Sequence, residues 1–231
     1  MRKIYEILGI AQTPVSHAEK IASALGGFIG IFCIFIVSQW AVGPNPAALI
    51  VASMGASAVL LFAVPHGPLS QPWSVLGGHI VSAIVGVSCA KFIPNAVLAG
   101  SLAVGAAIGF MYYLRCIHPP GGATAISAVI GGEGVHELGY QYVLTPILLN
   151  VIIILLVAII FNYAFAWRRY PAFLHKQQQP PSPVQPEAHT PHIAHEDFVY
   201  ALSEIDSFID IDERDLLRIY DLATKNSRQS S

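Results

Sequence analysis

The chain has 231 residues, of which 54% are hydrophobic and only 11% are charged, and its formal net charge is −2. This balance favours neither a nucleic acid nor an acidic partner, and we expect no nucleic acid to bind. Between residues 21 and 167 only four charged side chains occur, namely Lys91, Arg115, Glu133 and Glu137. A water-soluble domain of this length needs a charged surface, so we predict that this part of the chain lies in a lipid bilayer.

Six apolar segments follow one another along the chain. The first begins near Ile21 and has the length of a bilayer span, whereas the hydrophobic part of a cleavable signal peptide is shorter. We therefore interpret it as an uncleaved first span. Turns rich in proline and glycine separate the later segments. The six are Ile21–Val42, Ala47–Val64, Ser74–Phe92, Val97–Leu114, Gly121–Ile130 and Thr145–Trp167.

These segments predict an all-α fold, a polytopic helical membrane bundle. The fifth segment is too short to cross a bilayer, and the second could also enter and return on the same side. A tetrapeptide of the second segment, Gly55–Ala58 (GASA), returns in the fifth as Gly122–Ala125 (GATA). Its equivalent placement favours an inverted repeat of three plus three segments, a common plan in transporters.

Small residues recur every fourth position in three of the segments. Such rows let membrane helices approach closely, and we predict that they are packing seams. The rows are Gly26 and Gly30; Gly78, Ser82 and Gly86; and Ser101, Gly105 and Gly109.

Basic residues flank the first and the last segment, which predicts a multi-pass protein of the cell membrane with both termini in the cytoplasm. They are Arg2, Lys3 and Lys20 before the first segment, and Arg168, Arg169 and Lys176 after the last. Three aromatic residues are expected in the interfacial belts: Trp73, Trp167 and Tyr170.

The chain is expected to divide into four parts. A cytoplasmic N-terminal segment (1–20) precedes the transmembrane domain (21–170), and a linker rich in proline, glutamine and histidine (171–195) precedes a short cytoplasmic helical extension (196–224). The extension is too small to be stable alone, so we expect it to dock on a partner. That partner is either a second copy of the chain or a cytoplasmic protein. The linker histidines lack the rigid geometry of a metal site.

The most informative stretch follows the fourth segment. Pro119 and Pro120 suit the first turn of a helix, and the glycines after them leave the N–H groups at the helix start accessible. A half-helix that begins inside a membrane offers unpaired donors and a partial positive charge, which suits an anion. Thr124 adds a hydroxyl, His118 a donor whose charge responds to pH, and Arg115 a full charge. The alternative is a hinge that serves packing alone.

We predict that a small anion binds between two helix starts, near Gly55 and Gly122. His79 shares a helical face with Ser82 and Gly86, and it is either functional or a core histidine bonded to a carbonyl. No carboxylate occurs in the six segments, although a cation site normally needs one. The candidate substrate-binding residues are Gly55, Ser57, His79, Arg115, His118, Pro119, Pro120, Gly121, Gly122 and Thr124.

No catalytic motif competes with this interpretation, since the sequence lacks a nucleophile elbow, a phosphate-binding loop and an HExxH or paired-cysteine pattern. We therefore predict no enzyme activity, no cofactor and no metal. Two functions remain: a transporter or channel for a small inorganic anion, and a non-transporting membrane anchor or sensor that acts through residues 196–224.

Several blocks in order resemble the HPP family of integral membrane proteins, which is named for its His-Pro-Pro motif. They are Met54–Phe62, Pro65–Pro72, Gly77–His79 and His118–Ala125. The resemblance extends from about Ala18 to Trp167. Some members of the family have been implicated in nitrite transport, and some bacterial members carry regulatory domains of the cystathionine-β-synthase type after the membrane part. The resemblance implies a small-anion transporter with nitrite as the leading candidate, while the residues after Trp167 are expected to be too few for such a regulatory domain.

Overall fold

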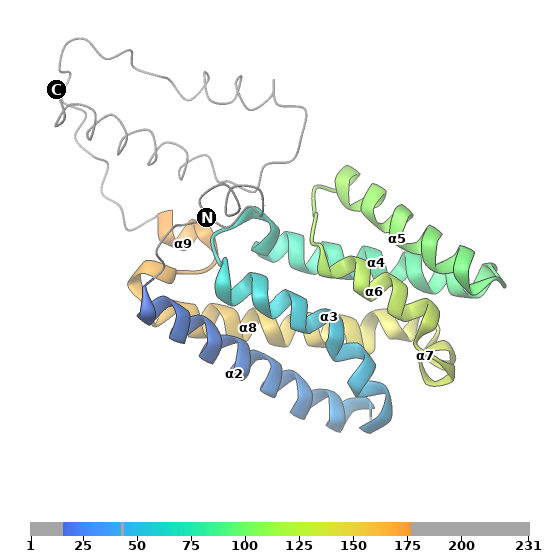
Figure 1. Cartoon of the computed structure of the whole chain (residues 1–231), viewed down its shortest axis with the longest axis horizontal. Helices are drawn as coiled ribbons and strands as arrows, with labels where there is room; N and C mark the ends of the chain where they lie inside the picture. Colours follow the sequence, from blue (N-terminus) through green and yellow to red (C-terminus); the bar gives the residue numbers. More distant parts are fainter. Residues whose placement is uncertain (1–15, 43, 177–231) are drawn as a thin grey trace, which may run out of the picture.

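The computed structural model describes residues 16–42 and 44–176, and its side chains are described for 16–41 and 52–174. These residues form a bundle of helices without a strand (Figure 1), so the predicted all-α membrane bundle is confirmed. The predicted extension, 196–224, lies outside the described residues. The elements are α2 (His17–Val42), α3 (Pro44–Ala63), η1 (Pro68–Ser70), α4 (Pro72–Phe92), α5 (Ala96–Tyr113), α6 (Pro120–Ile130), α7 (Glu133–Leu138), η2 (Val143–Leu148), α8 (Leu149–Tyr163), η3 (Ala166–Arg168) and α9 (Ala172–Lys176).

Local sequence explains where these helices begin. Prolines occupy the first turns of α4 and α6, where the missing N–H group costs no hydrogen bond. Before α5, the side chain of Asn95 accepts a hydrogen bond of 2.9 Å from the backbone N–H of Leu98. Each start follows a turn that already contains proline or glycine, as the segment boundaries predicted.

Four described helices are long and apolar enough to cross a membrane: α2, α4, α5 and the continuous η2–α8. When α3 and α6 are counted with them, successive helices alternate in direction in Figure 1, and α3 runs back along α2 over 20 residues. The second segment is therefore a single helix that does not reverse its direction. The fifth segment is short as predicted, since α6 has 11 residues.

The end of the bundle at which α2 begins also gathers the chain around residues 64–72 and the chain after α8. The hydroxyl of Tyr170 donates to the carbonyl oxygen of Ser70 at 2.8 Å. We call it the arginine end, because Arg115, Arg168 and Arg169 lie there. Tyr170 is fully buried, so its predicted place in the aromatic belt is wrong. The reason is that its hydroxyl finds a buried acceptor.

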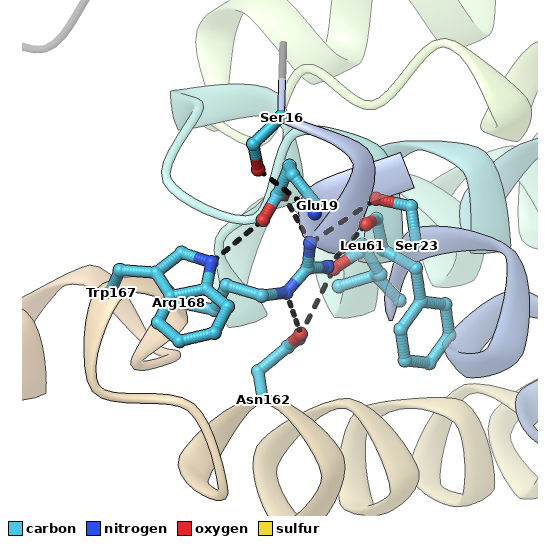
Figure 2. A network of polar contacts seen from close by, with 8 residues as sticks. Ser16, Glu19, Ser23, Leu61, Asn162, Trp167 and Arg168 are labelled. Carbon is cyan, nitrogen blue, oxygen red and sulfur yellow. Dashed lines mark hydrogen bonds and ion pairs between the residues drawn. The ribbon is translucent and has the colours of Figure 1, made fainter. Parts of the chain in front are cut away.

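Arg168 closes the bundle at the arginine end (Figure 2). Only 1% of its surface is exposed, and its guanidinium pairs with the carboxylate of Glu19 and donates to the carbonyl oxygen of Phe62. It also donates to Asn162 Oδ1 at 3.2 Å and to Ser23 Oγ at 3.1 Å. A single planar cation thereby joins α2, α3 and α8.

The helix contacts agree with a repeat of α2–α3–α4 in α5–α6–α8. A two-fold axis would exchange α2 with α5, α3 with α6, and α4 with α8. Accordingly, α2 packs on α3 and α8, α5 packs on α6 and α4, and the two middle helices α3 and α6 touch each other. This packing supports the predicted inverted arrangement.

Glycines form the closest contacts in the bundle. A β-carbon at Gly30 would lie 2.8 Å from the ring of Phe62, and one at Gly86 would lie 2.5 Å from the carbonyl oxygen of Ala125. The first two rows of small residues are therefore packing seams, as predicted.

The third row, on α5, is not a seam within the described part of the chain. Among those residues, nothing lies within 4 Å of a β-carbon built at Gly105 or Gly109. The helix instead turns its alanine face, Ala99, Ala103 and Ala107, toward the bundle. The prediction for this row is wrong because α5 carries small residues on both faces, and spacing alone does not tell which face is buried.

Gly86→Ala is expected to lower the thermal unfolding temperature of the purified protein in detergent. The new β-carbon would meet backbone atoms of α6, and overpacking of this kind costs about 1–3 kcal/mol. Gly105→Ala is the matched control in a neighbouring helix, where stability should stay equal or rise because alanine favours a helix. Equal unfolding temperatures for both variants would contradict the close contact of α4 and α6.

Candidate functional site

The connection between α5 and α6, residues 114–119, lies against α4, and α6 begins part-way along α4 (Figure 1). A β-carbon at Gly78 would be 2.5 Å from Cβ of His118, and one at Gly121 would be 2.9 Å from the carbonyl oxygen of Gly78. Gly78 is the seventh residue of α4. His118 therefore lies about 9 Å along that helix, at ~1.5 Å per residue.

Four buried side chains form a hydrogen-bonded chain at this depth, which we call the histidine network: Ser57, His79, His118 and Thr124. Ser57 Oγ lies 2.8 Å from Nε2 of His79 and 2.8 Å from Nε2 of His118. At the outer ends, Nδ1 of His118 lies 2.8 Å from the carbonyl oxygen of Leu69, and Nδ1 of His79 lies 2.7 Å from Oγ1 of Thr124. None of the four side chains is exposed.

Counting donors assigns the hydrogens when both rings are neutral. The carbonyl oxygen of Leu69 only accepts, so Nδ1 of His118 carries its proton and Nε2 is an acceptor. The single hydroxyl proton of Ser57 must then point to His118, and His79 must donate from Nε2 to Ser57. Nδ1 of His79 accepts from Thr124. One arrangement thus satisfies all four short contacts, and every donor points toward Leu69.

A cavity of about 290 Å³ lies beside this network at the arginine end. Two of its lining residues are chain neighbours of the network's outer end, since Pro68 precedes Leu69 and Ile117 precedes His118. The cavity also carries the positive charge of Arg115, an exposed residue with a positive φ of 54°. The lining consists of Pro68, Ser74, Tyr112, Arg115 and Ile117.

Comparison with known proteins gives one family. Residues 12–171 match the sequence model of the HPP family's transmembrane region. The chain belongs to the HPP family. Two transmembrane proteins of Dictyostelium discoideum are similar to it: one is 38% identical over 171 residues, covering 71% of this chain and 55% of the relative, and the other is 34% identical over 165 residues, covering 69% and 58%. The HPP chain thus spans less than two thirds of either relative. No solved structure matches it.

The structure brings together the four network residues among those predicted for the HPP site. Pro119 and Pro120 form the turn into α6, and Gly121 packs on α4. The GASA/GATA echo marks this arrangement, because Ser57 and Thr124 are its third residues and they contact opposite nitrogens of His79.

The predicted open donors at the start of α6 are absent from the described backbone. The N–H of Gly121 donates to the carbonyl oxygen of His118 at 2.8 Å, and that of Gly122 to Pro119 at 3.0 Å. A tight turn thus satisfies the groups that the motif seemed to leave free. The expectation that these N–H groups are unpaired is therefore wrong.

Gly55 and Arg115 lie apart from the network. Because α3 begins at Pro44, Gly55 is inside a helix and not at a helix start, so the prediction of two facing helix starts is wrong. Arg115 lines the cavity and does not contact the network. The GASA tetrapeptide alone did not show that α3 begins before it, at Pro44.

Two further contributions escape sequence reasoning. Leu69 acts through a backbone carbonyl, for which no side-chain pattern exists. The buried hydroxyl of Tyr142 donates to the carbonyl oxygen of Thr124 at 3.3 Å, although Tyr142 lies in a stretch that resembles a loop.

Ser57→Ala is expected to lower the free energy of unfolding by about 1–3 kcal/mol, because it leaves two buried imidazole nitrogens without their partner. Ser101→Ala, at an exposed position of α5, is the control and should unfold like the parent. The measurement is thermal unfolding in a single detergent. A Ser57→Ala protein as stable as the control would show that the hydroxyl does not bridge the rings.

Proposed function

We propose that this HPP-family protein carries a small inorganic anion across the membrane, with nitrite as the leading candidate. The observation that carries the proposal is the cavity lined by Arg115, which adjoins a buried polar network without a carboxylate. A membrane site for a cation normally contains carboxylates or converging carbonyl groups. Here the sequence has no Asp or Glu from residue 21 to residue 132.

The buried polar residues support a small, singly charged substrate. Apart from Arg168, which Glu19 neutralises, the described buried side chains with polar groups are serine, threonine, asparagine, histidine and tyrosine. Such groups solvate a weakly hydrated anion without a fixed charge that would trap it. The fully buried Asn150 adds a donor, because its Nδ2 has no acceptor among the described residues while its Oδ1 accepts from Ser38 at 2.7 Å.

The alternative function, an anchor or sensor without transport, depends on residues 196–224, which lie outside the described residues. Reconstituted flux separates the two functions. Proteoliposomes should take up nitrite faster than protein-free vesicles, and potassium at the protein-free rate. Nitrite uptake equal to that of protein-free vesicles would favour the anchor.

Arg115→Gln is expected to raise the KM for nitrite uptake about threefold to tenfold, because a positive charge at a cavity mouth raises the local anion concentration. Arg115→Lys keeps the charge at the same left-handed backbone position and should stay close to the parent. Added salt should shrink the difference, since exposed charges are screened. A KM that is unchanged in Arg115→Gln at low salt would remove the cavity from the uptake route.

We also propose that the arginine end faces the cytoplasm, with both termini on that side. The arginine end carries Arg115, Arg168 and Arg169. Lys91 lies in the last turn of α4, at the opposite end, and Glu133 and Glu137 lie in α7. This asymmetry follows the positive-inside rule.

A reporter fused after Ser231 tests the orientation. A reporter that is active only outside the cytoplasm should stay silent, and one that is active only inside should give full signal. The reverse result would overturn the orientation and leave the fold unchanged.

A further inference from the structure

The hydrogen-bond contacts of the histidine network accommodate a neutral state and a state with one additional proton, with the same heavy-atom positions. In the neutral state, two longer contacts remain without a proton: Ser57 Oγ to the carbonyl oxygen of Ser53 at 3.3 Å, and Thr124 Oγ1 to that of Pro120 at 3.5 Å. Each hydroxyl therefore has a second carbonyl oxygen within reach. A hydroxyl that loses its present acceptor can rotate without leaving its proton unpaired.

One additional proton fits the same heavy-atom positions. The added proton binds Nδ1 of His79. His79 then passes its Nε2 proton to the hydroxyl oxygen of Ser57, and Ser57 passes its own hydroxyl proton to Nε2 of His118. His79 is again neutral and donates to Thr124, whose hydroxyl turns to the carbonyl oxygen of Pro120. His118 now carries both protons and donates to Leu69 and to Ser57. Every donor again has an acceptor.

A second proton does not fit. The ring centroids of His79 and His118 are 4.9 Å apart, and two positive charges at that distance repel strongly in a medium of low dielectric constant. The network therefore accepts a single proton.

The described residues around the network supply no negative charge to balance this proton. Among the described residues, the titratable groups nearest the network are the thiol of Cys116, the phenol of Tyr142 and the exposed Arg115, and none is an anion at neutral pH. The helices that pack round the network, α3, α4, α6 and α8, contain no Asp or Glu. A buried charge without a partner is strongly disfavoured, so a negative charge must arrive with the proton.

We propose that the histidine network is the proton site of the transporter and that the transported anion neutralises it, so that one proton and one anion cross together. This inference rests on the anion transport proposed above. The anion approaches from the cavity that adjoins His118, and electroneutral coupling follows from the absence of a carboxylate in these helices. The competing role for the network is purely structural, with both rings permanently neutral.

Nitrogen-15 NMR of histidine-labelled protein in lipid distinguishes the two roles. In the absence of nitrite at neutral pH, His118 should carry its proton on Nδ1 and His79 on Nε2. With nitrite at acidic pH, His118 should show two protonated nitrogens, and the His79 proton should appear on Nδ1. Signals are assigned with His79→Gln and His118→Gln. Two rings that stay neutral with nitrite down to the pH of unfolding would overturn the proposal.

Transport is measured in proteoliposomes that contain a pH-sensitive dye, with the membrane potential clamped by potassium and valinomycin. Nitrite uptake should acidify the lumen and should not respond to the clamped potential. With one proton per anion, an inward gradient of one pH unit should support about tenfold accumulation of nitrite. Nitrous acid crosses lipid unaided and reaches the same final ratio, so the protein's contribution is measured as the initial rate of nitrite uptake above that of protein-free vesicles.

His118→Gln and Thr124→Val should lose the protein-dependent initial rate of pH-driven nitrite uptake. Thr124→Ser, which keeps the hydroxyl, and His136→Gln, which lies in α7 outside the network, should keep that rate. Each variant is first checked for a single species by gel filtration. Nitrite uptake by the parent that follows the potential and moves no protons would overturn the coupling and leave anion transport standing. Uptake at the protein-free rate would instead overturn the proposed function.

Discussion

Gly78 and Gly121 let the backbones of α4 and α6 meet, and the position of the histidine network follows from that contact. With a β-carbon at either residue, the connection before α6 could not lie on α4, and His118 would not reach Ser57. In a bilayer, irregular backbone at this depth is tolerated only when protein covers it. The connection meets this condition because α4 lies directly beneath it.

Once His118 is in the bundle, each polar atom around it must find a partner inside the protein, since lipid offers none. The hydroxyl of Ser57 is the hydrogen-bond partner of both rings. The carbonyl oxygen of Leu69 determines which nitrogen of His118 carries hydrogen. The direction of every bond in the network therefore depends on one backbone acceptor beside the cavity. The hydrogen-bonded chain thereby connects Leu69, beside the cavity, with Thr124, on the far side of His79.

Sequence patterns predicted the helical bundle, the short fifth segment and the four side chains of the network. They succeeded because apolar length and proline-marked helix starts act locally. They failed where the outcome depends on tertiary contacts. Spacing did not show that the small residues of α5 at Gly105 and Gly109 face away from the chain, or that a tight turn occupies the N–H groups of Gly121 and Gly122.

The bundle contains two kinds of buried basic group, one with a carboxylate partner and one without. Arg168 is permanently charged, and the protein neutralises it with Glu19, which fixes three helices together. The network of His79 and His118 lies among helices without a carboxylate, and imidazole gains or loses its charge near neutral pH in water. Arg168 is already neutralised within the protein and does not need a mobile anion. A buried imidazole without a carboxylate partner is expected to become charged only when an anion accompanies the proton. The distribution of carboxylates thus separates the residue that holds the helices together from the residues that we propose respond to substrate.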